Sequence, residues 1–392
     1  MVWHMEHGES GSSWQQERNA VLRAARSIVI KVGSAVLTSS SGLDLRVVNR
    51  LADQIASLHD QEREIILVSS GAVSAGRSFL RSASREISLP EKQAAAAIGQ
   101  SRLMHSYDEA FERYNKITAQ ILLTRDDLRS RHRFLNARNT FATLLHNGII
   151  PIVNENDTVV VQELKFGDND FLATLILNLV QADLFINLTT AEGVYSANPE
   201  TDSRACKYDC IQQIKDLDLE AMCQGKSQHG SGGMYSKLLA ARRAAQIGVP
   251  TLIVSGRIPF VLEKVFAGEN LGSWVLPDKK TVSQRKFWLA YNLDPVGSVV
   301  LDAGARDALL FKGKSLLPAG ITSVHGHFEA GALIRILGPD ERQIGVGLSN
   351  FSHVDVQRIA GQRTKDLPSI LGAGSCTEEV VHRDNLLLDA VH

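Results

Sequence analysis

Short apolar runs alternate with amphipathic stretches over roughly the first seven-tenths of the chain. The runs Ile28–Ile30 and Ile65–Val68 have the length and the branched side chains of strands that are buried on both faces. Apolar residues from Val47 to Leu58 recur at helical spacing between them. The same reading predicts a helix over 94–111 and further strands over 117–123, 149–153 and 184–188. This alternation predicts an α/β fold, a three-layer α/β/α sandwich around a mostly parallel sheet.

The pattern changes after Pro277, where a polar break is followed by short apolar runs separated by glycine. We expect these runs, at 299–301, 308–310, 333–336 and 344–347, to form the short strands of a small β-rich domain. The predicted organisation is a flexible N-terminal extension over 1–26, a main domain over 27–280, a linker over 281–294, a small domain over 295–372 and a tail over 373–392.

Composition excludes several classes of protein. The 42 Lys and Arg residues nearly balance the 43 Asp and Glu residues, so no excess charge favours nucleic acid or an anionic membrane. No apolar stretch approaches the ~20 residues of a membrane span, and the first residues lack the apolar core of a signal peptide. We therefore expect a cytoplasmic location. The Cys206–Cys210 spacing fits neither a zinc site nor a disulfide framework, so no protein-bound metal is predicted.

Two glycine turns follow predicted strands. Lys31 ends the first strand and Gly33 follows it, which points the lysine toward the crevice where open α/β sheets bind ligands. A lysine suits phosphate, although a surface lysine at a strand end is the alternative. The small residues from Ser69 to Gly76 form a second turn, which leads into a helix and offers backbone N–H groups to an anion.

A glycine-rich segment from Gly230 to Gly233 precedes Lys237 and a helical run over 238–247. Glycine backbone, a helix N-terminus and a lysine together are typical of phosphate binding. The spacing is not that of a P-loop, and the alternative is a flexible linker before a helix.

Carboxylates and amides are concentrated in Asn154–Asp157 and Asp168–Asp170. Neighbouring carboxylates raise one another's pKa, and burial adds to the cost of ionising them, so a cation is needed among them. An ammonium group, a metal ion or a lysine would serve. Together with the two lysines this cluster indicates phosphoryl transfer, which depends on positioning and charge neutralisation. We expect the cluster to hold a cationic part of the acceptor.

These motifs together resemble the glutamate 5-kinases of the amino acid kinase family. Single motifs are shared with acetylglutamate, aspartate and uridylate kinases, whereas Asn-Glu-Asn-Asp combined with Gly-Asp-Asn-Asp is specific to the glutamate enzymes. The residues that carry the resemblance are Lys31–Ser34, Ser69–Ala72, Phe134–Arg138, Asn154–Asp157, Gly167–Asp170 and Gly232–Lys237.

The resemblance implies the amino acid kinase fold and transfer of the γ-phosphoryl group of ATP, with Mg²⁺, to the side-chain carboxylate of L-glutamate. This reaction is the first step of proline synthesis. The implied catalytic residues are Lys31, Lys237 and Asp170, and the implied glutamate-binding residues are Ser70, Asp157, Asn169 and Asn154. The implied nucleotide-binding residues are Lys31, Gly33, Thr189, Thr190, Ser231, Gly232, Gly233, Met234, Tyr235, Ser236 and Lys237. The family usually has Asp where this chain has Thr190, whose hydroxyl can still donate or accept a hydrogen bond.

The C-terminal region from about Val296 to Leu371 resembles a PUA domain, on the strength of Leu316–Ile321 and Gly326-x-Phe328. Other PUA domains bind RNA. From Asp294 onward, however, nine Lys and Arg face twelve Asp and Glu, and this negative balance argues against RNA binding. The resemblance also implies a homo-oligomer, a dimer or a tetramer, and feedback inhibition by proline.

Two rival hypotheses stay open. The first is another kinase of the same fold, acting on acetylglutamate or uridylate, although such acceptors favour arginine over an Asp/Asn cluster. The second is a non-catalytic RNA-binding or regulatory scaffold, against which the two lysines and Asp170 argue.

Overall fold

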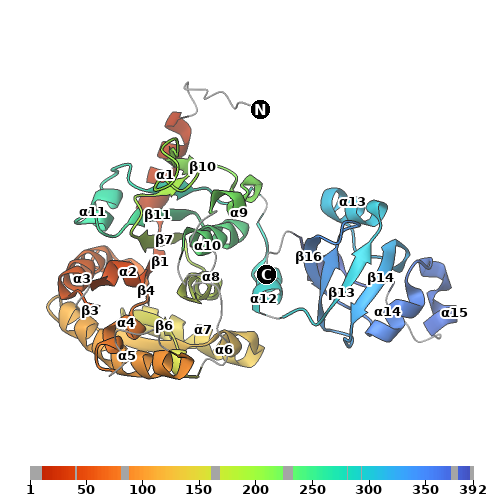
Figure 1. Ribbon diagram of the computed structural model, residues 1–392, viewed down its shortest axis with the longest axis horizontal. Coiled ribbons are helices and arrows are strands. Elements are labelled where there is room, and N and C mark those ends of the chain that lie inside the picture. Colours follow the sequence, from red (N-terminus) through yellow and green to blue (C-terminus); the bar gives the residue numbers. More distant parts are fainter. Residues whose placement is uncertain are drawn as a thin grey trace. The chain divides into compact units, whose positions relative to one another are not determined.

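The computed structural model of the chain describes residues 11–39, 42–80, 88–159, 168–223, 233–279, 281–292, 294–371 and 378–388. It divides into two compact units, Met1–Thr281 and Val282–His392, each with its own sheet and core (Figure 1). The two units are described separately below.

The first unit is built on an eight-stranded sheet. Its helices are α1 (Gly11–Ala24), α2 (Ser34–Leu37), α3 (Leu45–His59), α4 (Ala72–Arg77), α5 (Leu89–Glu112), α6 (Arg125–Arg129), α7 (Arg131–His146), α8 (Asp168–Val180), α9 (Leu219–Met222), α10 (Met234–Gln246) and α11 (Val261–Phe266), with 3₁₀ turns η1 (Asp157–Val159) and η2 (Ile214–Asp216). Its strands are β1 (Ser27–Val32), β2 (Thr38–Ser39), β3 (Gly42–Leu43), β4 (Glu64–Ser69), β5 (Thr118–Leu123), β6 (Ile150–Glu155), β7 (Leu184–Thr189), β8 (Val194–Tyr195), β9 (Lys207–Tyr208), β10 (Cys210–Ile211), β11 (Thr251–Ser255) and β12 (Ser273–Val275).

The strand order in this sheet is β10-β12-β11-β7-β1-β4-β6-β5. Every neighbouring pair is parallel except β11 and β12. The predicted strands and the mostly parallel sheet are therefore confirmed. Helices cover both faces: α3 and α11 lie on one side of the strands in Figure 1, and α8 and α10 lie on the other. This is the predicted three-layer sandwich.

Strand β1 lies at the centre of the sheet and separates the two layers of helices. Ile28, Ile30 and Val32 belong to the core that includes residues of α3, α5 and α11. Because side chains alternate along a strand, Lys31 points to the opposite face, which α8 covers. One polar residue in an apolar strand is thereby directed into the layer that contains the candidate site.

Helices α4 and α5 cross in direct backbone contact. A Cβ added to Gly99 would lie 1.8 Å from the Ala72 carbonyl oxygen, and one added to Gly76 would lie 1.9 Å from that of Ala95. No side chain fits at either position, so the two glycines fix the depth at which α5 packs. α4 begins two residues after Ser70, so the position of α5 is tied to the end of β4.

The second unit contains a five-stranded sheet of order β14-β13-β15-β16-β17. Only β13 and β15 pair in parallel. Its strands are β13 (Gly297–Leu301), β14 (Ile321–Gly326), β15 (Leu333–Leu337), β16 (Gln343–Leu348) and β17 (Leu386–Leu388). Its helices are α12 (Gln284–Asn292), α13 (Ala303–Lys312), α14 (His353–Ile359) and α15 (Leu367–Leu371), with 3₁₀ turns η3 (Pro318–Gly320), η4 (Thr364–Asp366) and η5 (Arg383–Asn385).

One predicted strand of this unit was wrong. The run 308–310 lies in α13, which begins where the Asp302 side chain accepts a hydrogen bond from the Ala305 N–H. The helix ends at Gly313, whose φ of 58° suits glycine. The two caps outweigh the strand-like apolar run between them.

Two further segments have structure where the sequence suggested little. Helix α12 lies within the expected linker over 281–294, and α1 lies within the expected N-terminal extension, where Leu22 and Arg18 are buried. Among the described residues, no helix combines the length and the apolar character that crossing a bilayer requires.

Candidate active site

A carboxylate between two ammonium groups forms the centre of the site. Asp170, in the first turn of α8, lies 2.6 Å from Lys31 Nζ through Oδ1 and 3.2 Å from Lys237 Nζ through Oδ2. The three residues are 1%, 2% and 3% exposed, respectively. The structure therefore brings together residues 67 positions apart along the chain. Neither lysine is the surface residue or the linker residue that the alternatives proposed.

Two neutral donors complete the surroundings of Asp170. Asn187 Nδ2 donates to Oδ1 at 3.0 Å, and Ser236 Oγ donates to Oδ2 at 2.7 Å. Asn187 is the register partner of Lys31 across β1 and β7, so both side chains leave the same face of the sheet. Four donors on two oxygens use the acceptor capacity of a carboxylate.

The electrostatics of this cluster follow from burial and from charge. Burial alone would raise the pKa of Asp170, but the ammonium groups of Lys31 and Lys237 outweigh it and hold that pKa well below its ordinary value. Burial lowers the pKa of Lys237, and the charge of Asp170 opposes that shift. Asp170 is thus neutralised by lysines. This corrects the expectation that a substrate ammonium group compensates it.

A second, uncharged cluster lies at the neighbouring strand ends. Asn169 precedes Asp170 in α8, and its Nδ2 lies 3.0 Å from Ser70 Oγ and 2.9 Å from Asn154 Oδ1. Ser70 follows β4, and Asn154 lies near the carboxyl end of β6. Because parallel strands end at the same edge of a sheet, these side chains meet beside the lysines. Asn169 therefore joins two other predicted glutamate-binding residues, Ser70 and Asn154.

The fourth, Asp157, lies in η1 and is partly buried. Burial raises the pKa of this carboxyl to about 6. Asp168 begins α8, and its side chain is outside the described part of the structure.

The predicted nucleotide-binding residues lie on two sides of the lysines. A Cβ added to Gly33 would lie 4.0 Å from Lys31 Nζ, an ordinary van der Waals distance, so the turn after β1 lies directly beside this ammonium group. Ser236 Oγ also lies 2.8 Å from the Gly233 carbonyl oxygen, so this hydroxyl sits between Asp170 and the start of α10, where Met234 and Tyr235 lie. Ser231 and Gly232 are outside the described residues.

Thr189 ends β7, and Thr190 follows it. The Thr189 carbonyl oxygen accepts a hydrogen bond from the Gly256 N–H, and that of Thr190 lies 3.4 Å from Ser255 Oγ. These contacts tie the end of β7 to β11. The replacement of the family's aspartate by Thr190 leaves the cluster around Asp170 complete.

Sequence reasoning missed two residues of the site. Asn187 was detectable, because a polar residue interrupts the apolar run of β7. Gln100 of α5 was not: its Oε1 accepts a hydrogen bond from Asn154 Nδ2 at 2.7 Å, but it sits in an alanine-rich helix with no local signal.

The arrangement can neutralise an anion next to a neutral, hydrogen-bonding pocket. The two lysines supply positive charge, and the Asn and Ser groups supply donors and acceptors without net charge. Within the described residues, no group of three or more His, Cys, Asp or Glu is placed to hold a metal ion.

Comparison with known proteins decides the family. The model of the amino acid kinase family matches residues 26–255, which is most of the first unit. The chain belongs to the amino acid kinase family. The PUA domain model matches residues 297–371 of the second unit, so both predicted fold classes are confirmed.

Several members of the amino acid kinase family are similar to this chain over nearly its full length. Glutamate 5-kinase of Oleidesulfovibrio alaskensis is 61% identical and that of Nitratidesulfovibrio vulgaris is 58% identical, each over 96% of this chain and 99% of the relative. Glutamate 5-kinase of Geobacter sulfurreducens is 48% identical over 95% of this chain and 100% of its own.

Proposed function

We propose that this protein transfers the γ-phosphoryl group of ATP to the side-chain carboxylate of L-glutamate and forms glutamyl 5-phosphate for proline synthesis. The observation that carries the proposal is the buried Lys31–Asp170–Lys237 cluster beside the Ser70 hydroxyl and the Asn154 and Asn169 amides. Relatives that are glutamate 5-kinases over nearly the whole chain support the same acceptor.

The reaction needs little proton chemistry from the protein. A glutamate side chain has a pKa of about 4.3, so it is already ionised at neutral pH and needs no general base. One of its oxygens attacks the γ-phosphorus, the bond to the bridging oxygen of ADP breaks, and ADP leaves with that electron pair. Both reactants are anions, so the barrier is lowered chiefly by positive charge held in place.

Lys31 and Lys237 supply that charge. Each is buried and is held by one oxygen of Asp170, so neither has to reorganise when the phosphoryl group transfers. Burial weakens the hydration that would otherwise compete for the ammonium groups. Asp170 is the residue that fixes their spacing, and Asn187 and Ser236 fix Asp170.

The same contacts bear on the metal. Asp170 already accepts four hydrogen bonds, which leaves it no lone pair to offer as a metal ligand. We therefore propose that Mg²⁺ enters as part of the substrate, bound to the phosphates of ATP, where it neutralises their charge. Gly33, Thr189, Thr190 and residues 231–237 would line the nucleotide.

Amino acid recognition falls to the uncharged cluster and Asp157. Asn169 Oδ1 is buried and has no hydrogen-bond partner among the described residues, so it can accept from an ammonium group. Asp157 would pair with the same group once it is ionised. An acceptor with an acetylated amine or a nucleotide phosphate would leave Asn169 Oδ1 and Asp157 without a cation. This favours glutamate over the two rival substrates.

Hydroxylamine trapping of an acyl phosphate tests the proposal. The purified protein, ATP and Mg²⁺ are incubated with glutamate, aspartate, N-acetylglutamate or uridylate. Because phosphorylated uridylate is a phosphoanhydride that hydroxylamine does not trap, ADP release is measured alongside. We expect hydroxamate and acceptor-dependent ADP release from glutamate alone. Turnover of N-acetylglutamate or uridylate in place of glutamate would contradict the assigned substrate, and no turnover of any acceptor would favour the non-catalytic scaffold.

Four further features stay proposals. We propose that the enzyme acts in the cytoplasm, assembles as a homo-oligomer and is inhibited by proline at the glutamate site. We also propose that the PUA domain has a structural or regulatory role and does not bind RNA, since its charge balance is negative.

A further inference from the structure

A continuous line of hydrogen bonds joins three elements of the first unit, α5, β6 and α8, and the residue that follows β4. Gln100 of α5 accepts from Asn154 of β6, and Asn154 accepts from Asn169 of α8. Asn169 in turn donates to the Ser70 hydroxyl after β4. Three of these residues are proposed to bind the amino acid. Gln100 lies behind them and is buried.

Backbone groups fix which end of each side-chain amide in this line is the oxygen and which is the nitrogen. The N–H of Glu155 donates to Asn154 Oδ1 at 2.9 Å, and the carbonyl oxygen of Ser69 lies 3.4 Å from Asn169 Nδ2. A backbone N–H can only donate and a carbonyl can only accept, so the two amides cannot exchange their oxygen and nitrogen without losing these contacts.

This orientation of the amides leaves Asn154 Nδ2 in need of an acceptor. Asn154 is 2% exposed, so water does not supply one. Gln100 Oε1 does, at 2.7 Å. A buried donor without a partner is unfavourable enough to displace its side chain. Loss of the Gln100 carbonyl therefore frees Asn154 to rotate, and Asn169 loses the oxygen that orients it.

The Nε2 atom of Gln100 indicates that packing does not explain why an amide occupies this position. Its Nε2 is buried and has no hydrogen-bond partner within the described residues. An apolar side chain of similar length, such as Met, would fill the space without burying that donor. The carbonyl arm is the part of Gln100 that the site uses.

We propose that Gln100 is a positioning residue for the amino acid substrate: it holds Asn154, and through it Asn169, so that Asn169 Oδ1 faces the substrate ammonium group. This inference rests on the proposed function. The packing of α5 supports it, because the adjacent Gly99 seats α5 directly on α4 and so fixes the height of Gln100 relative to Ser70.

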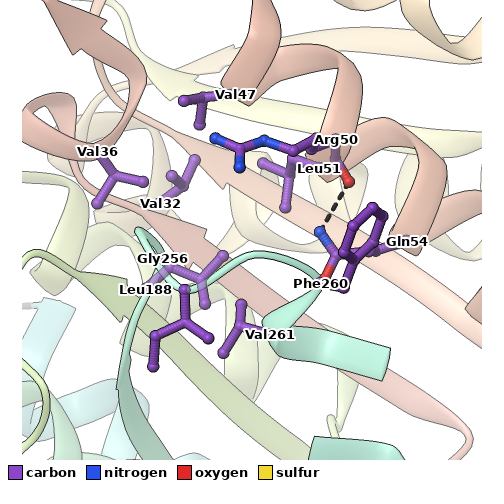
Figure 2. Close-up of a pocket in the computed structure, with 11 residues that line it drawn as sticks. Val32, Val36, Val47, Arg50, Leu51, Gln54, Leu188, Gly256, Phe260 and Val261 are labelled. Carbon is purple, nitrogen blue, oxygen red and sulfur yellow. Dashed lines mark hydrogen bonds between the residues drawn. The ribbon is translucent and has the colours of Figure 1, made fainter. Parts of the chain in front are cut away.

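The chain offers a matched control in Gln54 of α3. Gln54 is also buried, 4% exposed against 9% for Gln100, but both of its arms bond to backbone groups. Its Nε2 donates to the Arg50 carbonyl oxygen at 2.7 Å, and its Oε1 accepts from the Leu262 N–H at 2.8 Å. Figure 2 shows Gln54 with its bond to Arg50 at a pocket of about 20 Å³, room for roughly one water. Gln54 contacts none of the proposed substrate-binding residues in these bonds.

The test compares Gln100→Met, Gln100→Glu and Gln54→Met with the unmodified enzyme, by steady-state kinetics and by the shift of Tm that glutamate produces. For Gln100→Met we expect the KM for glutamate to rise about tenfold or more, the equivalent of one buried hydrogen bond, with the KM for ATP within about twofold. The stabilisation by glutamate should shrink in parallel. Gln100→Glu retains an acceptor oxygen and should restore the KM for glutamate to within about threefold.

Gln54→Met should lower Tm and leave the KM for glutamate unchanged. An unchanged KM for glutamate in Gln100→Met overturns the positioning role. So does a rise in KM that is equal for ATP and glutamate and is also seen in Gln54→Met. If Gln100→Glu is too unstable to purify, the two Met variants decide alone. If the unmodified enzyme does not phosphorylate glutamate, the proposed function and this inference are both overturned. If it does, but Gln100→Met has the same KM for glutamate, only the inference is overturned.

Discussion

The two halves of the candidate site differ in the polar groups that they bury: one buries charged groups and the other buries neutral ones. Around Asp170 the protein buries full charges and balances them internally, with two lysines on one carboxylate. Around Asn169 it buries neutral amides and a hydroxyl, which bond one another. The first arrangement suits a group whose charge shifts during reaction, and the second suits recognition of a fixed shape. Rate and specificity should therefore be separable by mutation.

The largest effect should come from removing a charge. Lys237→Ala should lower kcat by about a thousandfold or more, because the transferred phosphoryl group loses a positioned cation. Circular dichroism should show an intact fold. Lys207→Ala is the control, since Lys207 also pairs with a carboxylate, Asp209 at 3.0 Å, and its other contact is the Gly272 carbonyl oxygen, not a residue of the proposed site. Near-normal turnover of Lys237→Ala would falsify the role of the lysine.

Asp170→Asn should be the most destabilising change in the site. It leaves two buried ammonium groups without their carboxylate, and breaking a buried ion pair from one side costs about 3–5 kcal/mol. Urea denaturation measures this loss. The control Asp209→Asn removes a half-exposed partner and should change the free energy of unfolding by less than about 1 kcal/mol. Equal losses in the two variants would contradict the contrast between them.

Gly99→Ala tests the uncharged half through its support. The new Cβ would lie 1.8 Å from the Ala72 carbonyl oxygen, so α5 must move away from α4 at a cost of about 1–3 kcal/mol. We expect a raised KM for glutamate with little change in the KM for ATP. Gly304→Ala is the control, because its Cβ would meet nothing closer than Asp302 Oδ1 at 3.4 Å. A Gly99→Ala enzyme with unchanged stability would show that the helices have room to separate.

The smallest effect concerns pH. Burial raises the pKa of Asp157 to about 6, above the value of about 3.9 in the unfolded chain. The folded state therefore binds the proton more tightly, and the stability this contributes at low pH is lost as the pH rises through about 6. Ionised Asp157 is the form that pairs with an ammonium group. The KM for glutamate should rise several-fold as the pH falls below 6.

Asp157→Asn should remove this pH dependence while raising the KM for glutamate at pH 8. A pH profile that keeps its inflection near 6 in Asp157→Asn would assign the titration to another group.

Much of the site was predictable because it lies at chain positions with local signals. Lys31 ends an apolar strand, Gly33 opens a turn, and Lys237 opens a helix after glycines. Their convergence at the carboxyl ends of parallel strands follows from the fold class. The run 308–310 was misread for the converse reason: three apolar residues have no period, and the caps at Asp302 and Gly313 decided the helix.

The sequence by itself determined the α/β class and the family, and it singled out Lys31 and Lys237 as candidates, because these depend on local patterns and on motif order. Tertiary structure alone decided what neutralises Asp170, since Lys31 and Lys237 lie far from it along the chain, on either side of it, and meet it only in the folded protein. It also decided the roles of Asn187 and Gln100, whose partners are set by sheet register and by the contact of α4 with α5. Pairings between residues far apart in the chain depend on packing, and no local pattern encodes them.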